Sequence, residues 1–222
     1  MIMFMYKEEE RDPRNGTDET GGGKGAAEGG FRIIAVTNRH LSAGDYFERM
    51  EKIVSSGADA VIVREKDLKE REYEELARRV IKICERAQIS CILHTYAEAA
   101  VRLNCRKIHF PLHVLRVLSR SQETMLRHFS TVGASVHSPE EAREAQALGA
   151  DYVTAGHVFA TDCKRGLEPR GLEFLRETVN AVSIPVFAIG GISAENVKAV
   201  RKAGAAGACI MSQMMRGEFY EK

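Results

Sequence analysis

From Phe31 onward, short runs of apolar residues alternate with longer stretches in which apolar positions recur every three or four residues. The short runs are rich in valine, isoleucine and alanine, and several are apolar throughout, which is typical of parallel strands buried on both faces. The longer stretches have the period of amphipathic helices. Strands are predicted at residues 32–37, 60–64, 90–94, 107–110, 131–137, 152–156, 185–189 and 207–211, and the predicted helices include residues 45–56, 69–87, 139–148 and 194–203.

Three of the predicted helices end in closely related phrases that run directly into a strand. Each phrase opens on a glycine, which suits the left-handed position just after a helix. A repeated helix-to-strand step indicates a repeated βα unit, and about eight such units predict a single-domain α/β fold, the (β/α)8 TIM barrel. A doubly wound open sheet is the alternative, because periodicity cannot show closure. The phrases are Gly57-Ala58-Asp59-Ala60, Gly149-Ala150-Asp151-Tyr152 and Gly204-Ala205-Ala206-Gly207.

The two ends of the chain differ from this alternating region. Residues 8–30 contain almost no apolar side chain larger than alanine, so residues 1–30 are predicted to form a disordered N-terminal tail before a barrel of residues 31–222. Only ten residues follow Ser212, which predicts a shortened final helix. A short helix would leave apolar surface beside the last strand, to be covered by a second copy in a homo-oligomer, by residues 1–6, or by nothing.

Composition narrows the class of protein. The chain has 222 residues, 44% of them apolar, which suits one globular domain with a large core. Its 32 basic and 31 acidic residues give a formal net charge of +1, so neither a nucleic acid nor an anionic membrane is expected as a partner. No apolar run approaches the roughly 18 residues of a membrane span and no secretory signal is seen, which predicts a cytoplasmic protein. The five cysteines are scattered and odd in number, so reduced thiols are expected rather than a disulfide framework or a structural zinc site.

Polar residues gather where the predicted strands end, and the active sites of TIM barrels lie at those ends. Gly190 and Gly191 follow the seventh predicted strand, where amides without a nearby Cβ allow a phosphate monoester to approach, and Ser212 follows the eighth. A tight turn that needs positive φ is the alternative reason for the two glycines. Each polar residue, taken alone, is more often structural than catalytic. The strand-end residues are Arg64, Lys66, His94, His109, Ser135, His137, Thr161, Lys164, Gly190, Gly191 and Ser212.

The phrases around these residues form a pattern of their own. They are Val61-Ile62-Val63-Arg64-Glu65-Lys66, Ser135-Val136-His137-Ser138, Gly149-Ala150-Asp151-Tyr152 and Ala188-Ile189-Gly190-Gly191-Ile192. Together they resemble the superfamily of thiamine-phosphate synthase and its relatives, over residues 31–215. A longer and more specific phrase, GHVFATDCKRGL at residues 156–167, resembles the thiazole tautomerase branch of that superfamily.

The chain departs from the synthase pattern at the positions that serve its chemistry. The synthase couples an aminopyrimidine pyrophosphate to thiazole phosphate with magnesium, and its pattern has a glutamine where this chain has Ile62. Thr95 and Val114 stand where that pattern has carboxylates, whereas its lysine is retained as Lys66. The resemblance therefore favours the tautomerase. The synthase, a transferase, is one alternative, and a non-catalytic binder of a phosphate ligand or a regulator is another.

The tautomerase resemblance implies isomerisation of an exocyclic-alkene carboxythiazole phosphate, a small-molecule substrate, to its aromatic isomer without a cofactor or a metal. It implies that His137 is the catalytic residue, because a histidine both accepts and returns a proton near neutrality. The remaining assignments are Lys66 or Lys164 on the substrate carboxylate, Arg64 or His109 on the ring, Ser135 and Thr161 as further substrate contacts, and Gly190, Gly191 and Ser212 on the phosphate.

Two other features of the histidines are expected to have no catalytic meaning. His157 lies in the tautomerase-like phrase, but its apolar neighbours Val158 and Phe159 indicate packing within the loop, with catalysis as the alternative. His109 and His113 have the four-residue spacing of a helical metal site. Pro111 between them marks a break from strand to helix, so no metal site is predicted.

Overall fold

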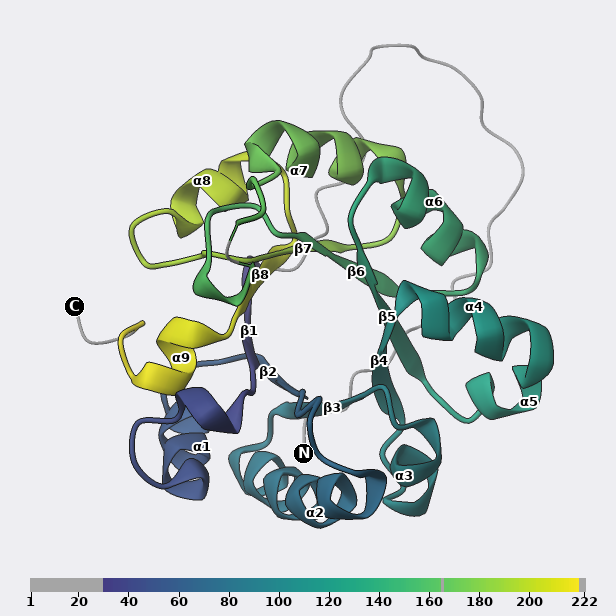
Figure 1. Cartoon of the computed structure of the whole chain (residues 1–222), viewed down its shortest axis with the longest axis vertical. Helices are drawn as coiled ribbons and strands as arrows, with labels where there is room; N and C mark the ends of the chain where they lie inside the picture. Colours follow the sequence, from purple (N-terminus) through teal and green to yellow (C-terminus); the bar gives the residue numbers. More distant parts are fainter. Residues whose placement is uncertain (1–29, 165, 220–222) are drawn as a thin grey trace, which may run out of the picture.

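The computed structural model describes residues 30–164 and 166–219, so the predicted tail lies outside the described residues apart from Gly30. Eight parallel strands pair in chain order and close into a barrel, with β8 against β1 (Figure 1). This closure confirms the predicted (β/α)8 barrel and excludes the open sheet. The strands are β1 (Arg32–Val36), β2 (Ala60–Val63), β3 (Ser90–His94), β4 (Lys107–Pro111), β5 (Thr131–Val136), β6 (Tyr152–Gly156), β7 (Val186–Ile189) and β8 (Gly207–Ile210).

The helices form a ring around the strands (Figure 1). Asp45 caps the first of them by accepting two backbone N–H bonds, at 2.9 and 3.0 Å. Gly57, Gly149 and Gly204 have φ angles of 92°, 87° and 91°, which confirms the left-handed positions predicted for them. The helices are α1 (Tyr46–Ser55), α2 (Glu70–Ala87), α3 (Ala97–Arg102), α4 (Leu112–Ser121), α5 (Glu123–Leu126), α6 (Pro139–Ala147), α7 (Gly171–Ala181), α8 (Val197–Lys202) and α9 (Ser212–Arg216), with short 3₁₀ turns η1 (Arg39–Leu41) and η2 (Asp162–Lys164).

Alternation along the strands divides the core into two layers. One set of strand side chains, which includes Ile34, Ile62 and Phe187, packs inside the barrel. The other set, which includes Ala35 and Val61, packs outward against the helices. The barrel interior is therefore filled by side chains, as the fold requires, and the space for a ligand is left at the rim rather than through the centre.

The repeated phrases at the helix-to-strand steps make the same pair of contacts twice. Asp59 Oδ2 accepts from the amide of Ile33 at 2.6 Å, and Asp151 Oδ2 accepts from the amide of Val132 at 2.7 Å. The amides of the two aspartates donate to the carbonyls of those same residues. Each aspartate thereby ties the start of its own strand to the preceding strand. The third phrase has Ala206 at this place and makes backbone bonds alone.

Helix α9 is short, as predicted, but the apolar surface beside β8 is covered by the chain itself. Met214 and Met215 are fully buried. The amide of Ala43 donates to Met215 O at 3.0 Å, and Arg49 Nε donates to Met214 O at 2.7 Å. These bonds hold α9 against the segment from η1 to α1, beside which it lies in Figure 1. The described residues thus bury Met214 and Met215 by themselves, whereas a contact with a second copy stays a prediction and residues 1–6 lie outside the described residues.

Two further expectations concern the membrane and the cysteines. Among the described residues, no helix has both the length and the apolar character needed to cross a bilayer. Cys84, Cys91, Cys105 and Cys209 are free thiols. Burial raises the pKa of Cys209, which keeps this thiol protonated and unreactive.

We expect Asp151→Ala to lower the free energy of unfolding by about 1–2 kcal/mol, because the amide of Val132 loses a charge-assisted partner. Asp151→Asn retains an acceptor oxygen and should lose less than half as much. Urea denaturation followed by circular dichroism measures both changes. Equal losses for the two variants would show that the carboxylate does not act through this bond.

Candidate active site

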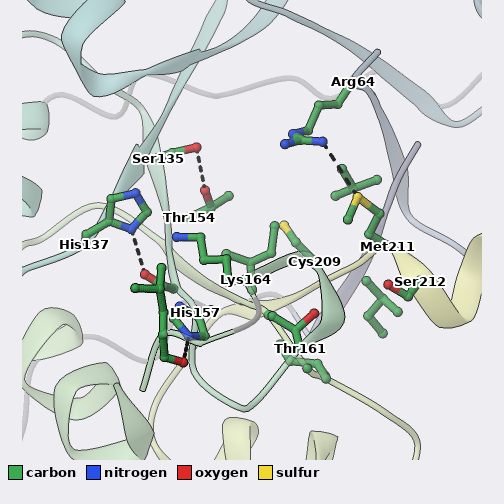
Figure 2. Close-up of a pocket in the computed structure, with 18 of the residues that line it drawn as sticks. Arg64, Ser135, His137, Thr154, His157, Thr161, Lys164, Cys209, Met211 and Ser212 are labelled. Atoms are coloured by element: carbon green, nitrogen blue, oxygen red, sulfur yellow. Dashed lines mark hydrogen bonds between the residues drawn. The ribbon is translucent and has the colours of Figure 1, made fainter. Parts of the chain in front are cut away.

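A cavity of about 850 Å³ lies at the carboxyl ends of the strands (Figure 2). Every strand of the barrel, or the loop that follows it, contributes at least one lining residue. Among the residues expected at the site, His109 alone does not line the cavity. The lining includes Arg64, Lys66, Ser135, His137, Thr161, Lys164, Gly190, Gly191 and Ser212.

His137 follows the last residue of β5 and is held from two sides. Glu141 Oε2 accepts from its backbone amide at 2.6 Å, and Ser138 caps α6 by accepting from the amide of Glu141 at 3.1 Å. The ring Nδ1 lies 2.7 Å from Gly156 O. Because a carbonyl oxygen only accepts, Nδ1 carries a proton and the neutral ring keeps its lone pair on Nε2. Figure 2 shows the ring on the side of the cavity opposite Met211, facing Ser135 and Lys164.

Cationic side chains gather around the same cavity. Burial lowers the pKa of Lys66, and the positive charges of Arg64 and Lys164 lower it further. Burial also lowers the pKa of Lys164, with added effects from Arg170 and Arg64. Each lysine is therefore close enough to other cations for their repulsion to disfavour its charged form. An anionic ligand would relieve this repulsion, so the cluster favours a negatively charged substrate.

Glu65 explains how Arg64 and Lys66 both reach the cavity. The Glu65 carboxylate is buried, and it accepts from the Thr37 hydroxyl at 2.7 Å and from the amide of Arg39 at 3.0 Å. Thr37 Oγ1 in turn accepts from the amide of Arg64 at 2.9 Å. Glu65 is thus fixed at the end of β1, and the residues on either side of it line the cavity.

The turn after β7 packs closely under the loop between β6 and α7. Gly190 and Gly191 have φ angles of 100° and 65°, so the tight-turn reason for these glycines is supported. A Cβ on Gly190 would lie 2.3 Å from His157 Cβ, and one on Gly191 would lie 2.3 Å from Ala160 O. A side chain here would therefore strike the loop before it reached a ligand. Asn196 braces the turn by donating to Gly191 O at 2.8 Å.

The loop from β6 to α7 carries Thr161 and Lys164 over the cavity. His157 anchors it: its carbonyl accepts from the amide of Arg170 at 3.0 Å, and its ring Nε2 lies 3.3 Å from Leu167 O. The side chain of His157 is buried. These contacts support the packing interpretation of His157, as a residue that shapes the loop.

His109 is buried behind Ser135, with its Nε2 2.9 Å from Ser135 Oγ. His109 was expected to orient the substrate ring, but it does not line the cavity and reaches it only through its hydrogen bond to Ser135. Sequence reasoning missed Thr154, which lines the cavity from β6 and pairs in register with Ser135. The period of two along β6 could have found it, because residues 152, 154 and 156 share one face of the strand.

The residues at the rim do not fit the magnesium site of the synthase pattern. Thr95 directs its hydroxyl to His94 Nδ1 at 2.7 Å, and Val114 packs against the core. Glu141, one of the carboxylates that line the cavity, is engaged by the amide of His137. In the described part of the chain, no group of three or more histidine, cysteine, aspartate or glutamate side chains is arranged to hold a metal ion. Mg²⁺ is usually held by one or two carboxylates together with substrate phosphates and waters, and Thr95 and Val114 supply no carboxylate at the positions of the synthase pattern.

The sequence and the structure of this chain are similar to those of known thiamine-phosphate synthases. A putative thiamine-phosphate synthase 2 from Aquifex aeolicus is 32% identical over 186 residues, covering 83% of this chain and 97% of the relative. A thiamine-phosphate synthase from Pyrococcus abyssi is 33% identical, covering 83% of this chain and 87% of the relative. The solved structure of thiamine phosphate pyrophosphorylase from Pyrococcus furiosus has a TM-score of 0.72 at 28% identity, covering 86% of this chain and 90% of that one. The sequence model described as thiamine monophosphate synthase matches residues 33–214, and the chain belongs to that family.

Proposed function

We propose that this chain is a thiazole tautomerase, an isomerase that converts the exocyclic-alkene carboxythiazole phosphate to its aromatic isomer. The observation that carries the proposal is the 2.7 Å hydrogen bond between His137 Nδ1 and Gly156 O. This bond selects the tautomer whose Nε2 is a base, in a residue that lines the cavity. The proposal adds a reaction to the family membership, which by itself does not distinguish an isomerase from a transferase.

The reaction needs one proton to leave the substrate and one to arrive. Nε2 of His137 takes the proton from ring carbon 2, beside the carboxylate, and the electron pair of that C–H bond moves into the ring. The ring double bond moves by one position to the ring carbon that carried the exocyclic alkene. The electron pair of the exocyclic double bond forms the new C–H bond when the exocyclic carbon takes up the proton that His137 returns. Atoms and electrons balance without an oxidant, a reductant or a metal. One acid/base residue therefore serves both transfers.

The charges around the cavity suit the two anionic groups of this substrate. Arg64, Lys66 and Lys164 supply positive charge for a carboxylate and a phosphate monoester. We assign the carboxylate to Lys66 or Lys164, and the phosphate to the turn of Gly190 and Gly191. Both glycines line the cavity, and within the described part of the chain their amides donate to no backbone carbonyl, which supports this assignment. The contribution of Ser212 to the phosphate and of Thr161 to the substrate belongs to the same proposal.

We expect His137→Asn to lower the isomerisation rate by roughly 10²- to 10⁴-fold while product still binds, because asparagine hydrogen-bonds but cannot cycle a proton. Single-turnover conversion of the unaromatised substrate, followed by absorbance, measures the rate, and calorimetry measures product affinity. His40→Asn is the matched control, because His40 is exposed on η1 outside the cavity. A rate within a few-fold of the parent protein would make His137 structural. Product binding without any turnover by the parent protein would favour the non-catalytic binder.

The synthase is the second candidate, since the relatives carry that name and Arg64 and Lys66 are present at the cavity. We expect no thiamine phosphate from aminopyrimidine pyrophosphate, thiazole phosphate and magnesium, because Thr95 and Val114 offer no carboxylate to the metal. A fluorescence assay for thiamine phosphate tests this. Product that depends on the enzyme would reassign the chain to the transferase.

We expect Gly190→Ala to destabilise the protein by about 2–4 kcal/mol, since the added methyl combines overpacking against His157 with strain at positive φ. Gly149→Ala is the matched control: its φ is 87°, but a Cβ there meets no atom within 4 Å. The control should lose about 1 kcal/mol from backbone strain alone. Urea denaturation compares the variants, and calorimetry should show weakened product binding for Gly190→Ala alone. Equal stability losses would mean that the loop does not rest on this turn.

A further inference from the structure

A chain of buried hydrogen-bonding groups leads from the barrel interior to the cavity. His109 Nδ1 lies 3.0 Å from the hydroxyl of Tyr152, and His109 Nε2 lies 2.9 Å from Ser135 Oγ. Tyr152 and His109 are 6% and 2% exposed, whereas Ser135 lines the cavity. The imidazole therefore connects a buried phenol to a hydroxyl at the candidate active site.

The register of three neighbouring strands builds this connection. Gly133 of β5 pairs with His109 of β4 on one side and with Tyr152 of β6 on the other. A Cβ at position 133 would lie 2.5 Å from His109 Nδ1 and 2.2 Å from Tyr152 Cζ. The contact between phenol and imidazole thus passes directly over a glycine, and any side chain there would displace it.

The buried phenol decides which nitrogen of His109 carries the proton. Within the described part of the chain, His109 Nδ1 is the one hydrogen-bond partner of the Tyr152 hydroxyl. A buried O–H left without an acceptor costs about 1–3 kcal/mol, so the phenol donates to Nδ1. A neutral imidazole has one donor and one acceptor nitrogen. Nε2 therefore carries the proton and donates to Ser135 Oγ.

His109 holds this neutral form under ordinary conditions. Burial, and secondly the positive charge of Arg64, lower its pKa to about 3. Burial also raises the pKa of Tyr152 well above its ordinary value, so the phenol keeps its proton. Above about pH 5 the imidazole is thus a fixed neutral connector, which separates it from His137, the proposed base.

The consequence appears at Ser135. Its oxygen accepts from His109 Nε2, and the Thr154 hydroxyl, 3.3 Å away, donates to the same oxygen. A serine oxygen has two acceptor lone pairs and one proton, so the proton of Ser135 is left for the cavity. We infer that Tyr152 and His109 are positioning residues that make Ser135 a dedicated hydrogen-bond donor to an anionic oxygen of the ligand.

The proposed reaction gives this donor a task. As the proton leaves ring carbon 2, negative charge spreads to the adjacent carboxylate, and a donor already oriented toward it stabilises that charge without reorganisation. The cations bind the carboxylate already in the ground state, whereas the hydrogen bond from Ser135 strengthens as negative charge develops on it. The choice of the carboxylate as acceptor rests on the proposed function, whereas the proton position on His109 does not.

The proton position can be measured on the unaltered protein. Long-range proton–nitrogen correlation spectra of protein labelled with ¹⁵N-histidine distinguish the two neutral tautomers from the charged ring. We expect His109 to be neutral with its proton on Nε2, from about pH 5 to pH 8. A proton on Nδ1, or a charged ring in this range, would overturn the inference whatever the activity of the enzyme.

Kinetics test the task of the donor. We expect Ser135→Ala to lower kcat roughly 10- to 100-fold, and Tyr152→Phe to lower it roughly 3- to 10-fold with loss of the single tautomer. Tyr96→Phe is the matched control, because it removes a half-buried phenol that donates to Leu68 O outside the cavity. If Tyr152 acts only through Ser135, the double variant is no slower than Ser135→Ala. Additive losses would make Tyr152 a general structural residue and contradict its positioning role.

The two proposals fail in different ways. If the protein has no tautomerase activity but His109 is protonated on Nε2, the proposed function is refuted. The inference that Ser135 donates its proton toward the cavity then still stands. Ser135→Ala and Tyr152→Phe should then still weaken binding of the aromatic carboxythiazole phosphate, measured by calorimetry. Unchanged binding in both variants would show that Ser135 donates to no ligand oxygen.

Discussion

Pairing of β8 with β1 is the contact on which the whole site depends, because it turns a sheet with two edges into a ring. In an open sheet of the same strand order, Ser212 and Arg64 would lie near opposite edges. In the closed barrel, Arg64 Nη1 lies 3.9 Å from Met211 Sδ, next to Ser212. Gly207 permits this joint, since a Cβ there would lie 2.2 Å from Arg32 O. Closure therefore brings Ser212, a proposed phosphate contact, to the same part of the rim as Arg64, one of the cations that line the cavity.

The features that could be predicted from the sequence are those that depend on neighbouring residues, namely the strands and the ends of the helices. The period of apolar positions located the strands, and Gly57 and Gly149 marked helix ends because the left-handed position is a property of a single residue. The burial of α9 beside β8 could not be predicted, because it depends on contacts of Met214 and Met215 with residues far away in the sequence, such as Ala43 and Arg49. Closure was predicted from the number of βα units and not from the periodicity, because the bonds between β1 and β8 join residues about 175 positions apart.

Family similarity and site chemistry give different information about this chain. The match over residues 33–214 reflects the strands, the turns and the packing that every member needs to build the barrel. We propose that the difference between a transferase and an isomerase rests on a few side chains, such as Thr95 after β3 and Val114 in α4, which contribute little to overall identity. Names shared by relatives at about a third identity therefore fix the architecture better than the reaction. The proposed reaction therefore rests on the side chains that line the cavity, His137 above all.

His137 and His109 were both predicted at the site because each lies at the end of a predicted strand. Their positions along the strands nevertheless give them different surroundings. His137 lies one residue beyond the end of β5, where it is half-buried and reaches the cavity. His109 lies two residues before the end of β4, where it is 2% exposed and enclosed by Tyr152 and Ser135. In our proposals, a shift of a few residues along a strand separates a histidine that exchanges protons from one that fixes the direction of a neighbouring hydroxyl. Depth in the barrel, set by strand register, decides which histidine reaches the cavity.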